Sequence, residues 1–338
     1  MANWMAWLPE DLDSVALRLA RVDGLVFELG QLAMNWSQND PLELAPVETQ
    51  PNQLDLTVEA VRPIPPMMSL MFSEAVHHLR AAIENTVYYT VETGRGAPLS
   101  EKQANAVAMP VSKDAAGFED WQKQRVQRGV PELGPGTTLG TRIQKLQPYA
   151  DSAAGMGSTS QRFAELTGTQ MVVEHPMVLL QRYSNLDKHR ALRVAAAQGI
   201  VDDINAPLGS NNRALRTLTV GDVLISCPLG TPVVVDVWPV VAIQRPTSQV
   251  WVAPVPELDN LHWYVSNIAI PSLLLHVIPP PPAMPPGIDL GDTGQRPRQR
   301  MESAGQAVAR ERLEPLVRKM LQEGLKKPVK IPPVGRLR

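Results

Sequence analysis

The amino-acid sequence predicts an α+β protein, a helical core packed with a mostly antiparallel β-sheet. Three observations predict it. Apolar residues recur at helical spacing through residues 1–190, and β-branched runs bounded by Gly, Pro, Asn and Asp fill residues 191–278. Prolines then crowd residues 279–300, which predicts an extended linker, and residues 301–338 form a basic amphipathic tail.

The helical part is expected to contain three long helices. Residues 11–36 place apolar side chains at steps of three and four, which aligns them along one side of a helix. Similar spacing predicts a second helix over about 69–92, and Pro at a tolerated first position opens a third over 176–190. Shorter helical pieces are expected over 114–127 and 139–148.

One strand is expected at 54–61, after a stretch at 39–53 whose Asn, Asp, Pro and Gln content predicts a loop. The β region is expected to supply five or six strands in one sheet, which the early strand can join. The predicted strands are ALRVAAAQ, ALRTLTV, DVLISC, TPVVVDVWPVVAIQ, QVWVAPV and NIAIPSLLLHVI.

Composition excludes several classes of protein. Thirty-two Lys and Arg against 34 Asp and Glu give a net charge of −2, so no overall charge attracts nucleic acid or an anionic membrane. The single cysteine, Cys227, excludes an internal disulfide framework, and its apolar setting predicts a packed core thiol. The start of the chain lacks the pattern of a signal peptide, and no apolar run reaches the roughly 20 residues that span a bilayer. A cytoplasmic protein without a membrane segment is therefore expected.

The tail is expected to form a helix that docks. Its apolar residues at helical spacing are Leu313, Leu316, Val317, Met320 and Leu321. Residues 296–338 hold twelve Lys and Arg against four Glu. Such a helix can bind a protein partner, RNA, or the body of its own or a sister subunit.

The second helix has a polar face opposite its apolar one. Its core-facing residues are predicted to be Phe72, Val76, Leu79, Ile83 and Val87. The opposite side carries His77, Arg80, Glu84 and Tyr88, with His78, Asn85 and Tyr89 along its edge. Arg80 and Glu84 stand four residues apart, which favours an ion pair.

The third helix carries a second polar stripe. It consists of Arg182, Asn185 and His189, flanked by Asp187, Lys188 and Arg190. Two interpretations remain open. The two polar faces can meet, within a subunit or across a homo-oligomer, so that arginines hold a phosphate while a histidine moves a proton. Alternatively, these groups form a buried network that fixes helix pairing, or a solvated face.

No metal or cofactor is expected. His77 and His78 are adjacent, so they point about 100° apart and do not chelate from one helix face. The sequence has neither HExxH nor CxxC, and it lacks the glycine-rich loops of nucleotide-binding folds and the GxSxG elbow of serine hydrolases.

Four motifs resemble an uncharacterised family of bacterial proteins, frequent in actinobacteria, that carries HNLRSALDHL and a later NxDKHR. The matching segments are HHLRAAIENTV at 77–87, AMPVS at 108–112, IQKLQPY at 143–149 and NLDKHR at 185–190. The resemblance covers residues 55–195. The family helix in turn resembles the Arg-x4-6-His signature of HEPN ribonucleases, helical dimers common in toxin and defence systems.

Arg80 matches the arginine of that signature, but Asn85 stands where the histidine belongs. An amide does not act as a general base, so catalysis would require His78 or His189 in its place. The resemblance therefore leaves two hypotheses. The chain is a non-catalytic structural or interaction protein of a phage-related or defence system, or a metal-independent RNA-binding or RNA-cleaving protein that uses Arg80, His78 and His189.

Overall fold

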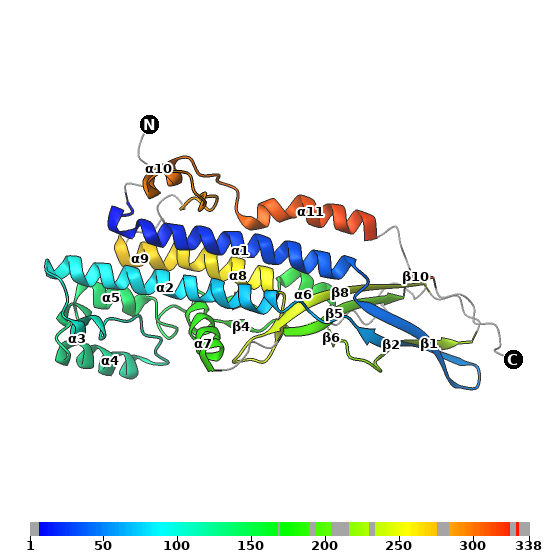
Figure 1. Ribbon diagram of the computed structural model, residues 1–338. Coiled ribbons are helices and arrows are strands. Elements are labelled where there is room, and N and C mark those ends of the chain that lie inside the picture. Colours follow the sequence, from blue (N-terminus) through cyan, green and yellow to red (C-terminus); the bar gives the residue numbers. More distant parts are fainter. Residues whose placement is uncertain are drawn as a thin grey trace.

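A computed structural model describes residues 7–167, 170–189, 194–203, 216–229, 234–275, 284–324 and 329–330. The protein has an α+β fold, in which long helices lie side by side and antiparallel strands extend from one end of the helical layer (Figure 1). None of the helices in these ranges is both long enough and apolar enough to cross a membrane.

Two antiparallel helices form the centre of the fold. After a short 3-10 turn, η1 (Glu10–Leu12), the chain forms α1 (Asp13–Gln38), and α2 (Met67–Arg95) packs along it. The apolar stripes predicted for both helices are buried between them and their neighbours. α2 ends where Gly96 takes a positive φ of 70°, a conformation that glycine adopts at little cost. The predictions of these two helices are confirmed.

Short elements follow α2 along the chain. They are α3 (Glu101–Ala104), α4 (Ala115–Gln127), η2 (Pro131–Leu133), α5 (Thr138–Lys145), β3 (Met156–Gly157), α6 (Gln161–Thr167), β4 (Val173–Glu174) and α7 (Pro176–His189). Asp114 and Thr137 cap the first turns of α4 and α5 by accepting backbone N–H bonds. The predicted helices at 114–127, 139–148 and 176–190 are thereby confirmed.

A three-stranded antiparallel sheet contains the early strand. Its order is β1 (Leu42–Gln50), β2 (Gln53–Val61) and β7 (Val223–Pro228), so the early strand does pair with the later β region. The loop predicted for 39–53 is wrong, because most of it forms β1. Pro46 is tolerated since β1 is an edge strand, and Asn52 with a φ of 67° makes the tight turn into β2. Cys227 on β7 is half-buried rather than enclosed in the core.

The other late strands form a second sheet, so the single sheet expected from the sequence is divided. Its order is β10 (Val329–Lys330), β8 (Val234–Gln244), β5 (Val194–Asp203) and β6 (Arg216–Thr217), and β9 (Trp251–Val252) also pairs with β8. All of these pairings are antiparallel.

Of the last two predicted strands, QVWVAPV contains β9, whereas NIAIPSLLLHVI is corrected to a helix. The chain forms α8 (Pro254–Tyr264), one π-helical stretch, η3 (Val265–Ala269), and α9 (Ile270–Leu274). Leu258, Leu261 and Leu273 in it are fully buried, and it packs against both α1 and α2. A helix that is covered on several sides is apolar all around, so its sequence shows no helical spacing of apolar residues. It then resembles the continuous apolar run of a buried strand.

The Pro-rich segment is packed where it is described, and residues 276–283 lie outside the described ranges. Met284 and Ile288 are buried in the core, so this part does not behave as an extended linker. It leads into α10 (Pro297–Glu302) and α11 (Ala309–Gly324).

The tail helix α11 docks on the body of its own chain, one of the possibilities that the sequence left open. α11 lies along α1 (Figure 1). The buried Asp23 of α1 accepts the backbone N–H of Ala309 at 2.6 Å and pairs with Arg312. Leu313 packs directly against Gly30, where a Cβ atom would lie 2.6 Å from its side chain.

Candidate functional site

Arg80 and Glu84, the predicted ion pair of α2, hold a backbone segment. Their side chains pair at 2.7 Å, and Arg80 donates to the carbonyl oxygen of Met109 at 2.5 Å. The N–H of Met109 donates to the second carboxylate oxygen of Glu84 at 2.7 Å. Both polar backbone groups of a buried residue are therefore bound by one pair of side chains. Only 18% of the Arg80 side chain is exposed, and its Nη1 is buried with no hydrogen-bond partner among the described residues.

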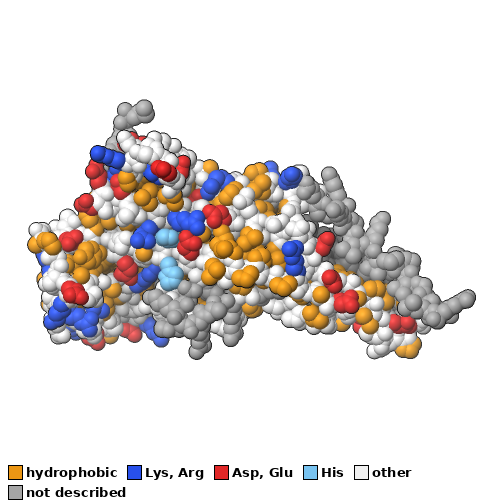
Figure 2. Space-filling model, viewed as in Figure 1, with side chains coloured by type: hydrophobic (Ala, Val, Ile, Leu, Met, Phe, Trp, Pro, Cys, Tyr) orange, Lys and Arg blue, Asp and Glu red, His pale blue; other side chains and the backbone are white. Residues whose placement is uncertain are grey.

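His78 belongs to a different cluster, between α1 and α2. Its Nδ1 lies 3.3 Å from the guanidinium of Arg18, and its Nε2 lies 3.6 Å from the carboxylate of Glu74, which Arg21 also binds at 2.8 Å. Figure 2 shows histidine among basic and acidic side chains over these two helices. Burial lowers the pKa of His78, and the charge of Arg18 lowers it further, which favours the neutral ring.

The structure places Arg80 and His78, two of the three predicted catalytic residues, in different clusters. Arg80 binds the segment at Met109, whereas His78 binds residues of α1. His77 is exposed on α2. On α7, Arg182 and Asn185 are exposed. The side chains of Asp187, Lys188, His189 and Arg190 lie outside the described part of the structure, so the contribution predicted for His189 remains a prediction.

Asn85 and its neighbours line an open hollow of about 590 Å³ between the start of α1 and the end of α2. The residues around it are Asp11, Leu12, Ser14, Asn85, Tyr88, Tyr89, Glu92, Thr93, Gly96, Ala97 and Pro98. These described lining residues include two carboxylates and no Lys, Arg or His. The place where the HEPN signature has its histidine therefore faces a surface that repels phosphate.

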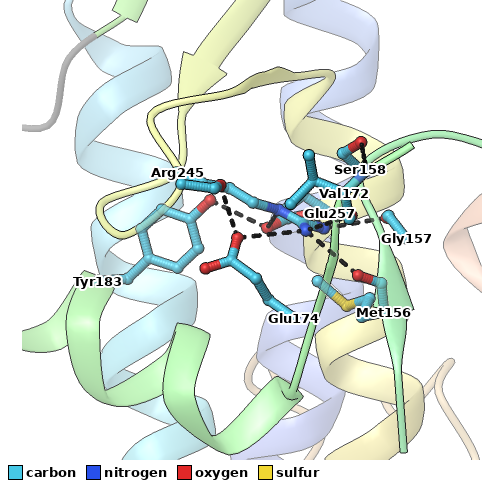
Figure 3. A network of polar contacts seen from close by, with 9 residues as sticks. Met156, Gly157, Ser158, Val172, Glu174, Tyr183, Arg245 and Glu257 are labelled. Atoms are coloured by element: carbon cyan, nitrogen blue, oxygen red, sulfur yellow. Dashed lines mark hydrogen bonds and ion pairs between the residues drawn. The ribbon is translucent and has the colours of Figure 1, made fainter. Parts of the chain in front are cut away.

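A buried polar network that the sequence analysis missed lies elsewhere in the fold (Figure 3). Arg245, at the end of β8, is fully buried. It forms a bidentate pair with Glu257 of α8 at 2.9 and 2.8 Å, and Tyr183 of α7 donates to the same carboxylate at 2.9 Å. Burial raises the pKa of Glu257, and the donors Arg245 and Tyr183 oppose that shift.

The remaining donors of Arg245 reach the small β3 and β4 pair. They bind the carbonyl oxygens of Met156 and Gly157 at 3.2 and 3.0 Å, and they approach Glu174 at 3.5 Å. The guanidinium thereby connects the second sheet, α7, α8 and the β3–β4 pair. Its donors are used by the protein itself, so the arrangement fixes the packing of these elements and offers no group to a ligand.

The sequence contains little that would have indicated this network. Arg245 stands alone between a β-branched run and a proline, and Glu257 has no charged neighbour three or four residues away on its helix. Arg245 and Glu257 are 12 positions apart, and the contacts of Arg245 with Met156 and Glu174 span 89 and 71 positions, separations at which helical or strand periodicity carries no information. The described residues also include no group of three or more His, Cys, Asp or Glu that could hold a metal ion.

Comparison of the chain with protein-family models, with curated proteins and with solved structures finds no match.

Proposed function

We propose that this chain is a non-catalytic structural or interaction protein with a HEPN-like helical core, acting in a phage-related or defence system. The observation that carries the proposal is the use of Arg80. Its guanidinium binds Glu84 and the Met109 carbonyl, which leaves no open arginine at the position that the HEPN signature assigns to the phosphate.

The surroundings of Arg80 support the same conclusion. A metal-independent ribonuclease, the alternative function, needs a cation and a general base around one open cleft. His78 lies in the Arg18 and Glu74 cluster, and the hollow beside Asn85 is acidic. RNA in that hollow would bring its phosphates against carboxylates.

The experiment is a cleavage and binding assay with labelled single-stranded and structured RNAs, without added metal. The 338-residue chain is compared with a variant that carries both Arg80→Ala and His189→Ala. We expect no cleavage by the wild type and the same weak binding by both proteins. Cleavage by the wild type that a folded double variant lacks would establish the nuclease alternative.

We also propose that the protein forms a homo-oligomer. α2 exposes two large apolar side chains, Met67 at 55% and Leu70 at 61%, and Figure 2 shows hydrophobic side chains gathered over α1 and α2. Sedimentation of the wild type and of Leu70→Glu tests this. An oligomer that the substitution dissociates supports the proposal, and a wild-type monomer at micromolar concentration contradicts it.

A further inference from the structure

The hollow between η1 and the end of α2 combines aromatic rings with carboxylates. Tyr88 and Tyr89 are half-buried, Asp11 is exposed and Glu92 is half-buried. Its volume of about 590 Å³ falls within the range of about 300–1,000 Å³ that is typical of ligand sites. A tyrosine face and a carboxylate both attract an organic cation, so the two kinds of side chain favour the same type of group.

The backbone adds to the negative field. Residues 96–98 follow the C-terminus of α2, where unpaired carbonyl groups carry a partial charge of about −0.5. The N-terminus of α1 contributes a similar positive charge, but it carries the acidic residues Glu10, Asp11 and Asp13. The acidic side chains therefore outweigh the positive helix end.

Neighbouring cations are engaged by other carboxylates. Arg95, on the last turn of α2, binds Glu132 through two hydrogen bonds of 2.8 Å. Arg298 of α10 pairs with Asp13 at 2.8 Å and also binds the carbonyl oxygen of Leu8. Neither of these cations belongs to the lining of the hollow, so the charges of Asp11 and Glu92 face it without a basic side chain between them.

We propose that this hollow binds an arginine side chain of a protein partner. The arginine would stack on a tyrosine ring and pair with Asp11 or Glu92. Charge complementarity argues for the cation. The planar, weakly hydrated guanidinium is the protein cation best suited to stacking and carboxylate pairing together. The hollow is open and much of its lining is exposed, which suits a side chain that a partner's backbone holds in place. The inference deepens the proposed interaction role and rests on it.

The test is fluorescence anisotropy with the 338-residue chain and a labelled peptide of alternating glycine and arginine. A peptide of alternating glycine and glutamine is the neutral control. We expect the arginine peptide to bind and the glutamine peptide not to bind. Asp11→Asn combined with Glu92→Gln should weaken binding by about two- to fivefold, because it removes the exposed carboxylate partners of the arginine.

Matched variants separate a local effect from a change in net charge. Glu43→Gln combined with Glu48→Gln removes the same charge from β1, at the opposite end of the molecule, and should leave affinity unchanged (Figure 1). Tyr88→Phe should retain binding, whereas Tyr88→Leu should weaken it about two- to fivefold through loss of the aromatic face.

Two results would overturn the inference. They are no binding of the arginine peptide, whether or not the free polyamine spermidine binds, and equal weakening by the β1 variant. The RNA assay is independent of this one. RNA cleavage refutes the proposed function even if the peptide binds. If the protein neither cleaves RNA nor binds the arginine peptide, only the proposed binding at the hollow is refuted.

Discussion

His262 on α8 should make the stability of the protein depend on pH. The ring is buried, and burial lowers its pKa from 6.5 to about 4, although a hydrogen bond with the backbone of Leu19 opposes the shift. Its Nε2 has no hydrogen-bond partner among the described residues. A proton added there would place a charge in the core without a counterion.

The sign follows from the two states of the chain. In the unfolded chain His262 is protonated below about pH 6.5, whereas in the folded protein it stays neutral down to about pH 4. The stability contributed by neutral His262 is therefore complete above pH 6.5 and is lost as the pH falls toward 4. Each pH unit in this window costs about 1.4 kcal/mol, so acidification to pH 4.5 should cost roughly 2.7 kcal/mol from this residue.

Urea unfolding of the wild type and of His262→Gln at about pH 7.5 and pH 4.5 measures this cost. Other groups titrate in both proteins and cancel in the comparison. The free energy of unfolding of the wild type should fall by about 2–3 kcal/mol more than that of the variant. Equal losses would refute the reasoning, because they would mean that His262 does not resist protonation in the folded state.

Two further substitutions test the packing. Glu257→Gln should cost about 3–5 kcal/mol in urea unfolding because it leaves the buried charge of Arg245 without its bidentate partner, and a loss below about 1 kcal/mol would contradict the network. Gly30→Ala should displace Leu313 and speed proteolysis at the start of α11. Gly24→Ala on the same helix, where the added Cβ would meet only the Glu28 side chain at 3.9 Å, should stabilise α1 by up to about 1 kcal/mol. Equal proteolysis of the two variants would contradict the docking.

The two long helices α1 and α2 were predictable from the sequence, because the spacing of their apolar residues indicates which side of each helix is buried. Residues 11–36 and 69–92 were assigned correctly for that reason, and the i, i+4 pairing of Arg80 with Glu84 followed from the same geometry. The errors occurred where periodicity is uninformative. Residues 254–274 are buried on several sides, and residues 42–50 form an edge strand that tolerates proline.

The sequence predicted that the candidate site residues share a polar face of one helix, but not which residues each of them contacts. The sequence indicated that Arg80, His78 and Asn85 lie on one helix, yet each has a different neighbour: the Met109 backbone, the α1 arginines and the acidic hollow. Those neighbours are set by tertiary packing, which helical spacing alone does not specify. The hydrogen bond between Asp23 of α1 and Ala309 of the tail is likewise set by tertiary packing and was not predictable from helical spacing.

The most direct test of the account is hydrogen exchange at the amide of Met109 in the wild type and in Arg80→Met. The account predicts that this amide and its neighbours in residues 106–112 exchange faster in the variant, because the Glu84 carboxylate that accepts the N–H loses its partner. Exchange in the C-terminal half of α2 should stay the same. Unchanged exchange at Met109 would contradict the structural role of Arg80 and reopen the possibility that its guanidinium serves a ligand.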